Sequence, residues 1–208
     1  MYRVASKLVE EGWEESPAEV ADGLCVFLFT WNKNAYRSGT IVSRDTLEQF
    51  LTRNKSALDR FRRKQITSFY PRRDTEKVKQ LFNEALDALA YPNERAKKKI
   101  SKSAVGVGKA FHLLAPSFFP LWDRAIAENC LSLEKKHVLS ASDYVEFMKL
   151  AQSAVISLEK QLAGDPESTG SPVAQHLPPA LSQIADRPKT VLKLLDEYYH
   201  TKYPKERI

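Results

Sequence analysis

The sequence predicts an all-α fold, for three reasons. Apolar residues recur at helical spacing over most of the 208-residue chain, so that they would line up on one face of each helix. Serine and aspartate, which cap helix N-termini more often than most residues, stand just before several of these stretches. Alternation of apolar and polar residues, the pattern of a strand, is nearly absent, and residues 40–42 are the one short candidate for extended structure.

The first two helices are expected over residues 2–13 and 17–36. Val4, Leu8 and Val9 would form the apolar face of the first. For the second, Ser16 stands at the N-cap and Pro17 at the first helical position, where a missing N–H costs nothing.

The middle of the chain predicts three further helices. The Ser38-Gly39 dipeptide interrupts the chain, Ser43 then caps a helix over residues 47–51, and another helix covers residues 58–66. Asp74 is expected to cap a long amphipathic helix over residues 78–89, which Pro92 ends.

The second half begins with an apolar helical run at residues 110–115, which Pro116 ends, and an amphipathic segment at residues 123–133. A strongly patterned helix follows, capped by Ser140 or Ser142 and reaching Leu162. Residues 164–175 are rich in Gly, Ser and Pro and predict a polar loop. Two short helices near residues 178–185 and 189–203 are expected to close the chain.

The composition is typical of a soluble globular protein, with 43% hydrophobic and 28% charged residues. The net charge of +6 suits a polyanionic partner. We expect Cys25 and Cys130 to be buried reduced thiols of a cytoplasmic protein. No CxxC pair supports an iron–sulfur cluster, the four His are scattered, and we expect neither a metal nor a cofactor. No secretory signal is evident, and the longest apolar run, residues 24–29, is too short to span a membrane.

The candidate functional stretch is residues 101–129. Gly106-Val107-Gly108 predicts a tight turn, since glycines permit positive φ and close approach of another backbone. Lys109 follows at once, and a helix that starts here would point free N–H groups at a phosphate. Further on, the apolar run Phe118-Phe119-Pro120-Leu121-Trp122 presents one acid, Asp123.

This stretch resembles the helix-hairpin-helix DNA glycosylases, the superfamily of endonuclease III and the 8-oxoguanine glycosylases. The hairpin of that superfamily reads roughly Leu-Pro-Gly-Val-Gly-x-Lys-x-Ala, and Ala104-Val105-Gly106-Val107-Gly108 matches it. Leu121-Trp122-Asp123 stands where the family's catalytic Asp segment follows. The resemblance implies a divergent, small bacterial member with a single domain over residues 1–208. It further implies a helix-hairpin-helix at residues 101–116 and two helical lobes, residues 1–37 plus 134–208 and residues 38–133, with the cleft between them.

The resemblance also implies that Asp123 is catalytic. Cleavage of a glycosidic bond builds positive charge on the sugar, which a nearby carboxylate stabilises while it aligns water. The alternative is that Asp123 only caps a helix that begins at Arg124. The family's lyase Lys corresponds to Ala110 here, with Lys109 one residue early, so we expect a monofunctional enzyme. Lys109 would then contact phosphate, the alternative being attack on the sugar to form a Schiff base.

Two further groups of residues complete the predicted site. The predicted DNA contacts are Gly106, Val107, Gly108, Lys109, Lys102, Lys97, Lys98, Arg62 and Arg63, although a charge run can also be a solvated face. The predicted base pocket consists of Trp31, Asn32, Asn34, Tyr36, Trp122 and His112, which mix aromatic faces with hydrogen-bonding groups. The alternatives are that the aromatic residues anchor the core and that His112 is a hydrogen-bonded structural residue.

The sequence therefore predicts a monomeric DNA glycosylase that acts on double-stranded DNA. It would flip out and excise a damaged or modified base and leave an abasic site. The base would be a lesion in host DNA, for repair, or a modified base in foreign DNA, for antiviral defence. The alternatives are a non-enzymatic helix-hairpin-helix DNA-binding module and a helical protein-interaction domain.

Overall fold

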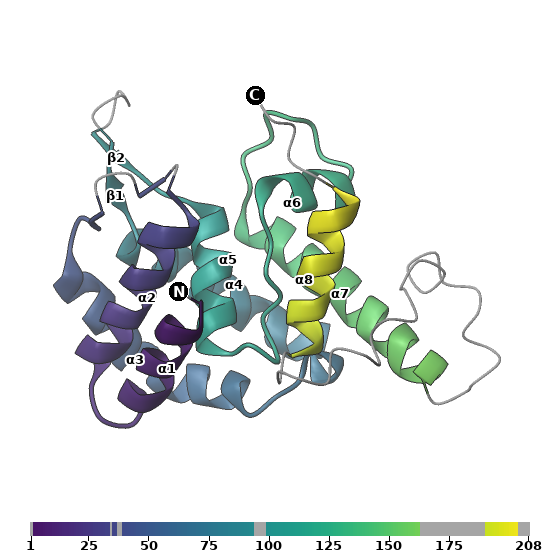
Figure 1. Cartoon of the computed structure of the whole chain (residues 1–208), viewed down its shortest axis with the longest axis horizontal. Helices are drawn as coiled ribbons and strands as arrows, with labels where there is room; N and C mark the ends of the chain where they lie inside the picture. The colour runs from purple at the N-terminus through teal and green to yellow at the C-terminus, as the bar shows by residue number, and fades with distance from the viewer. Residues whose placement is uncertain (1, 34, 37–38, 94–98, 163–189, 204–208) are drawn as a thin grey trace.

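The computed structural model describes residues 2–33, 35–36, 39–93, 99–162 and 190–203, and most of these are helical (Figure 1). The elements are α1 (Tyr2–Gly12), α2 (Pro17–Trp31), α3 (Arg44–Arg62), the 3-10 helix η1 (Ile66–Ser68), α4 (Pro71–Ala88), β1 (Tyr91–Pro92), β2 (Ile100–Ser101), α5 (Ala104–Leu114), α6 (Arg124–Cys130), α7 (Ala141–Leu162) and α8 (Val191–Lys202). The all-α prediction is thus confirmed at the level of class. The predicted loop at residues 164–175 and the helix near residues 178–185 lie outside the described residues.

The second helix starts as predicted and ends early. The Ser16 side chain accepts a hydrogen bond from the Glu19 N–H, and Pro17 occupies the first turn. The helix ends at Trp31 rather than at Tyr36, because the backbone of the C-cap residue Asn32 is not helical (φ −129°, ψ 45°); its N–H makes the last helical bond, to the Leu28 carbonyl at 2.8 Å. Tyr36 belongs to a turn beyond it, where its N–H bonds the Asn32 carbonyl at 3.0 Å.

The two helices predicted after Ser43, over residues 47–51 and 58–66, are one continuous helix, α3, which ends at Arg62; Ile66 belongs to η1. Ser43 is the N-cap, as predicted. No Gly or Pro interrupts the chain between residues 51 and 58, so the helix has no reason to stop. Asn54, a polar residue in this stretch, is buried and donates to the Glu84 carboxylate of α4 at 2.8 Å.

Asp74 does not cap α4, and this prediction is wrong. Pro71 starts the helix three residues earlier, with Tyr70 as the N-cap. Asp74 therefore lies in the first turn, fully buried, and accepts a hydrogen bond from the Tyr70 N–H at 3.1 Å.

A short strand pair that was not predicted joins α4 to α5. β1 and β2 are antiparallel, with Tyr91 opposite Ser101 and Pro92 opposite Ile100. Residues 40–42, the predicted extended piece, form no strand, although the Val42 N–H bonds the Ala90 carbonyl at 2.8 Å. Strands of two residues are too short for alternation to show in a sequence.

The prediction of a tight turn at Gly106-Val107-Gly108 is also wrong. Both glycines lie inside α5, which Ser103 caps by accepting from the Gly106 N–H at 3.0 Å. Gly39 is the glycine with a positive φ among the described residues. Since the strand pair precedes α5, residues 101–116 hold one helix and not a helix-hairpin-helix.

The two glycines are instead required for close packing. A Cβ at Gly106 would lie 2.7 Å from the Tyr36 hydroxyl, and a Cβ at Gly108 would lie 2.5 Å from the Trp122 ring. Real Cβ atoms do not approach other atoms this closely, so any side chain would force buried neighbours to move. The glycines let Tyr36 and Trp122 pack directly on the α5 backbone.

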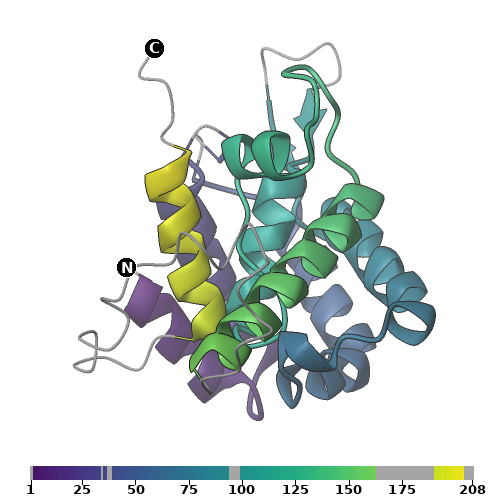
Figure 2. The same ribbon diagram turned by 90° about the vertical axis from the view of Figure 1, so that its right-hand side faces the viewer.

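Helix α5 forms the centre of the molecule. It lies between α1, α2 and α3 on one side and α6, α7 and α8 on the other (Figure 1), and every residue from Gly106 to Leu114 is buried. α7 packs on α4 and η1, and α8 packs beside α7 (Figure 2). α7 belongs to the predicted lobe of residues 1–37 plus 134–208, and it contacts α4 and η1 of the predicted lobe of residues 38–133. The division into two lobes stays a prediction.

The two cysteines and the apolar character of the helices were also the subject of predictions. Cys25 and Cys130 are free thiols, each half-buried. Burial raises the pKa of each thiol to about 11, so both are protonated near neutral pH. Among the helices of the described ranges, none is long and apolar enough to cross a membrane.

Candidate functional site

A surface cavity of about 640 Å³ opens at the N-terminal end of α5. Its walls come from the C-terminal end of α2, from β1, from the first turns of α5, from the start of α6 and from residues 138–139. Five of the predicted site residues line it: Trp31, Asn32, Lys102, Lys109 and Asp123. The structure thus brings the predicted catalytic residues and part of the predicted base-reading segment to one place.

Lys109 connects α5 to the end of α2. Its Nζ donates to the Trp31 carbonyl at 2.6 Å, and the residue is 8% exposed. Carbonyls in the last turn of a helix lack an intrahelical partner and carry partial negative charge, so a lysine ammonium stabilises them. Lys109 therefore positions the wall of the cavity that carries Trp31.

Asp123 both caps α6 and lines the cavity. Its Oδ1 accepts a hydrogen bond from the Ile126 N–H at 2.9 Å, as expected of an N-cap. The residue is 3% exposed, and the apolar run before it, including Phe118, Phe119 and Trp122, is buried. The carboxylate is therefore held in one orientation, with little water around it, at the edge of a cavity.

Helix α8 brings to Asp123 and Trp31 three residues that were not predicted to belong to the site. His200 Nδ1 lies 3.8 Å from Asp123 Oδ2, and His200 Nε2 lies 3.4 Å from Asp196 Oδ1. Lys193 Nζ lies 2.5 Å from Asp196 Oδ2 and 5.0 Å from the centre of the Trp31 ring. The spacing of Lys193, Asp196 and His200 on one helix face is visible in the sequence, but their proximity to α2 and α6 is not.

Three residues predicted to form the base pocket belong to the core instead. Tyr36 is 1% exposed and donates its hydroxyl proton to the Leu89 carbonyl at 3.0 Å. Trp122 is 1% exposed and donates its indole N–H to the Ala104 carbonyl at 3.1 Å. Neither lines the cavity, and both fill the space that the glycines of α5 leave open.

His112, the third, is fully buried. Its Nδ1 lies 2.9 Å from the Phe119 carbonyl and its Nε2 lies 3.1 Å from the Tyr2 hydroxyl. Burial lowers the pKa of His112 to about 4, so the ring is neutral at physiological pH. Because a carbonyl only accepts, Nδ1 carries the proton and Nε2 accepts from Tyr2. His112 thus has the structural role that was its alternative assignment.

The predicted phosphate contacts of the glycine segment are not available in this conformation. Gly106, Val107 and Gly108 are buried. The N–H of Gly106 bonds the Ser103 side chain, and that of Val107 bonds the Ser103 carbonyl at 3.0 Å. Because Ser103 starts the helix, it satisfies both of these donors, and neither is left for a phosphate.

Arg62 and Lys102, two of the predicted DNA contacts, lie at opposite ends of α5 and not on one face. Arg62 donates to the Leu114 carbonyl at the C-terminal end of α5 and to Glu10, both at 2.6 Å. Lys102 lines the cavity before the N-terminal end and pairs with Asp87. An 11-residue helix is about 16 Å long, so Arg62 is remote from the cavity. Arg63 is exposed at the end of α3, and Asn34, Lys97 and Lys98 lie outside the described residues.

Metal-ligating side chains do not cluster in the described part of the chain. There, no group of three or more His, Cys, Asp or Glu side chains is arranged to hold a metal ion. Comparison of the chain with protein-family models, with curated proteins and with solved structures gave no significant match.

Proposed function

We propose that the protein is a monofunctional DNA glycosylase that excises a damaged or modified base from double-stranded DNA. The observation that carries the proposal is the position of Asp123, a buried and oriented carboxylate at the wall of a cavity that Trp31 and Asn32 also line. A volume of about 640 Å³ lies within the range of small-ligand sites and admits a flipped nucleotide.

The chemistry follows from these side chains. A base that leaves the stack would be held by the Trp31 ring and by the amide of Asn32. Asp123 would lie beside the sugar, where its negative charge stabilises the cation that forms as the glycosidic bond breaks. The same carboxylate would orient the attacking water, and its capping bond to Ile126 keeps it from rotating away.

The cations around the cavity suit the DNA backbone. Lys33, Lys102 and Arg124 line it, in addition to Lys109. Exposed lysine and arginine side chains at the mouth of a pocket can follow the phosphates on either side of a flipped nucleotide. Lys109 would act as a structural support of the wall, because its ammonium already donates to the Trp31 carbonyl. This supports hydrolysis of the glycosidic bond by water rather than strand cleavage through a Schiff base.

The test is a panel of duplexes, each with one damaged or modified base, incubated with the full chain and treated with alkali. We expect one class of duplex to gain alkali-labile sites. The panel holds both common lesions and the modified bases of foreign DNA, so the productive class also separates repair from defence. If the protein binds duplexes but yields no abasic sites with any member, a non-enzymatic DNA-binding module replaces the glycosylase.

A further inference from the structure

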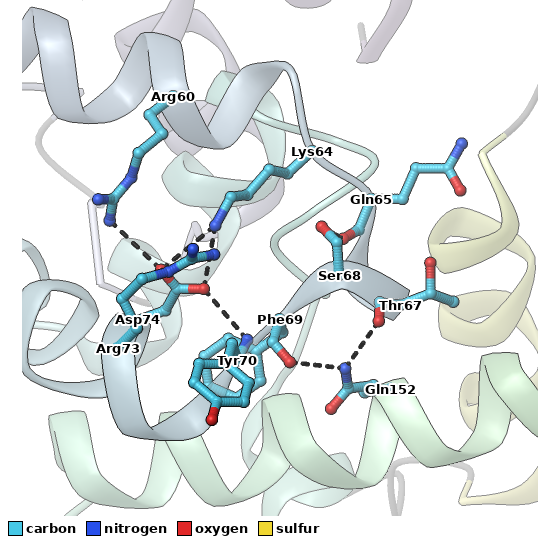
Figure 3. A network of polar contacts seen from close by, with 10 residues as sticks. All are labelled: Arg60, Lys64, Gln65, Thr67, Ser68, Phe69, Tyr70, Arg73, Asp74 and Gln152. Atoms are coloured by element: carbon cyan, nitrogen blue, oxygen red, sulfur yellow. Dashed lines mark hydrogen bonds and ion pairs between the residues drawn. The ribbon is translucent and has the colours of Figure 1, made fainter.

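A second cationic surface lies at the end of α5 away from the cavity. It is built around Asp74, and we call it the Asp74 platform: Arg60, Lys64, Tyr70, Arg73 and Asp74. Figure 3 shows three basic side chains converging on the Asp74 carboxylate from the end of α3, from the following loop and from the first turn of α4. Lys64 Nζ lies 5.7 Å from the centre of the Phe118 ring, which follows the C-terminal end of α5, so the Asp74 platform lies at that end of the helix.

The charges on the Asp74 platform do not cancel. Lys64 Nζ lies 3.0 Å from Asp74 Oδ2, Arg60 Nη2 lies 3.4 Å from Oδ1, and Arg73 Nε lies 3.5 Å from Oδ1. Three positive charges thus surround one negative charge, so that positive charge is in excess. Arg63 and Arg72, both exposed, neighbour the platform in sequence and add to the positive potential.

The two arginines keep donors for a ligand. Within the described residues, Arg60 reaches Asp74 through one terminal nitrogen and Arg73 through Nε. Each guanidinium carries five N–H groups, so most of them remain for another acceptor. The side chains are 45% and 60% exposed, respectively, whereas the Asp74 side chain is fully buried. The carboxylate positions the arginines from below, and their free edges are open to solvent.

The backbone under the platform is fixed from two sides. Gln152 of α7 donates to the Thr67 carbonyl at 3.0 Å and to the Phe69 carbonyl at 2.8 Å (Figure 3). The Ile66 N–H bonds the Ser117 carbonyl at 2.8 Å. A surface whose cations are already ordered loses little conformational entropy when it binds an anion. This distinguishes it from a run of solvated, mobile lysines.

Tyr70 adds an aromatic face to the platform. It is 52% exposed although it is a large apolar ring, and the Arg73 guanidinium lies 5.9 Å from its centre. An exposed aromatic ring beside ordered cations is the combination that binds single-stranded nucleic acid, with the base on the ring and the phosphate on the cation. Duplex DNA, whose bases are stacked inside, would leave Tyr70 unused.

We propose that the Asp74 platform binds single-stranded nucleic acid. Phosphates would contact Arg60 and Arg73, and an unpaired base would stack on Tyr70. The surface is about one helix length from the cavity, so it would hold a different part of a nucleic acid or a different molecule. The proposal does not depend on base excision, because none of its residues lines the cavity.

The test measures anisotropy of a fluorescent oligothymidylate with the full chain at several salt concentrations. The variant Arg60→Gln/Arg73→Gln keeps Lys64 and the Tyr70 N–H on Asp74. We expect the negative slope of log K against log salt to become shallower by about 1.4, at roughly 0.7 for each phosphate that the variant no longer neutralises. Tyr70→Ala should weaken binding roughly five- to a hundredfold, because the base loses its stacking partner. The matched control, Lys7→Gln/Arg53→Gln, removes two exposed charges outside the platform and should leave the slope unchanged.

Three results would overturn the proposal. The platform variant could show the same salt slope as the control variant. Tyr70→Ala, an exposed change that leaves the core intact, could bind as tightly as the original chain. Inorganic phosphate could displace the oligonucleotide at equal concentration of phosphate groups, which would assign the platform to a small anion. If the double arginine variant does not fold, Arg73→Gln and Tyr70→Ala decide the question by the same criteria.

Discussion

The glycines of α5 show that a residue can have a different structural role from the one that its sequence motif indicates. Gly108 is needed because the Trp122 ring lies where a Cβ would be. The ring is buried and bonded to the Ala104 carbonyl, so it has little room to move. The importance of this glycine therefore concerns stability rather than contact with DNA.

We accordingly expect Gly108→Ala to destabilise the protein by about 1–3 kcal/mol, as other overpacked cores are. Thermal unfolding measures the loss. In the background Trp122→Phe, which removes Nε1, one of the two ring atoms that lie 2.5 Å from the new methyl group, the same change should cost less. Equal costs in both backgrounds would show that Trp122 is not the source of the clash.

Asp74 links stability to pH. Burial raises its pKa, but the Tyr70 N–H, the Lys64 hydrogen bond and the nearby charges outweigh this, so the pKa of Asp74 lies below its usual range. An Asp in the unfolded chain titrates near pH 4, so the folded state gains stability above that pH and loses it as the pH falls through the lowered pKa.

The substitution Asp74→Asn should cost about 1–3 kcal/mol at neutral pH, because the buried side chain loses its charge-assisted hydrogen bonds from Lys64 and from the Tyr70 N–H, whereas Arg60 and Arg73 are exposed to water. The cost should shrink as the pH falls below about 4, where Asp74 of the unfolded chain takes up a proton, and it should reach its minimum once the pH has passed the lowered pKa of the folded state. Melting temperatures of both proteins between neutral and acidic pH measure this. A difference that stays constant over the whole range would mean that the charge of Asp74 is irrelevant.

Lys109 is the residue that decides between hydrolysis and strand cleavage. Its ammonium donates to the Trp31 carbonyl, and a Schiff base would require that bond to break. We expect borohydride to trap no protein–DNA adduct during excision. An adduct that disappears in Lys109→Ala would instead identify Lys109 as a nucleophile.

The position of a candidate site residue was predictable where its sequence surroundings are unusual. Asp123 was recognisable because an acid after a run of apolar and aromatic residues is unusual, and it does line the cavity. Tyr36, Trp122 and His112 were not assigned correctly, because a polar aromatic side chain has the same sequence signature in a pocket and in a core. Only the partners, such as Leu89 for Tyr36, separate the two.

At the scale of elements, α8 is the part of the site whose attachment can be tested separately. Lys193 and Asp196 are 12% and 4% exposed as side chains and pair at 2.5 Å. Lys193 also lies over the Trp31 ring. This pair therefore attaches α8 to the wall of the cavity.

Asp196→Ala leaves a nearly buried cation without its partner and should destabilise the protein by about 3–5 kcal/mol. Amide hydrogen exchange should increase first in α8, since the change loosens its contact with α2. The double variant Lys193→Met/Asp196→Leu removes both charges and should recover part of the loss. If the double variant is as unstable as the single one, the ion pair does not hold α8 in place.

Helix starts were predicted well where a capping residue or Pro17 marks them, and poorly elsewhere. Ser16, Ser43 and Asp123 all cap the helices that follow them. α4 begins earlier than predicted because Pro71 outweighs Asp74 as a start signal. The strand pair β1–β2 is too short for alternation to show, and the packing position of α8 follows from long-range contacts, which local patterns do not contain.

At the scale of the whole molecule, the cavity arises because segments far apart in the sequence meet around α5. The end of α2, at Trp31, and the start of α6, at Arg124, are distant in the chain, yet both line it. The sequence predicted the all-α class because helical periodicity is local. It could not predict which helix ends converge, since that depends on how the buried faces of all helices pack together.

The molecule would therefore have two separate surfaces for nucleic acid. The cavity at one end of α5 suits a flipped nucleotide, and the Asp74 platform at the other end suits an unpaired strand. Both contain cations that the fold already orders, through the bond of Lys109 to Trp31 and that of Arg60 to Asp74. The net charge of +6 is consistent with such partners.

If the Asp123 carboxylate stabilises the sugar cation, as we propose, the excision rate of the variant Asp123→Asn will reveal it. Asn caps a helix about as well as Asp, so the melting temperature should barely change. Excision should fall on the order of a hundredfold or more, as when one electrostatic stabiliser is removed from another active site. The matched control is Asp45→Asn, which alters an exposed acid in the first turn of α3, outside the cavity, and should leave excision unchanged. Full excision activity in Asp123→Asn, with its fold intact, would contradict the proposed mechanism.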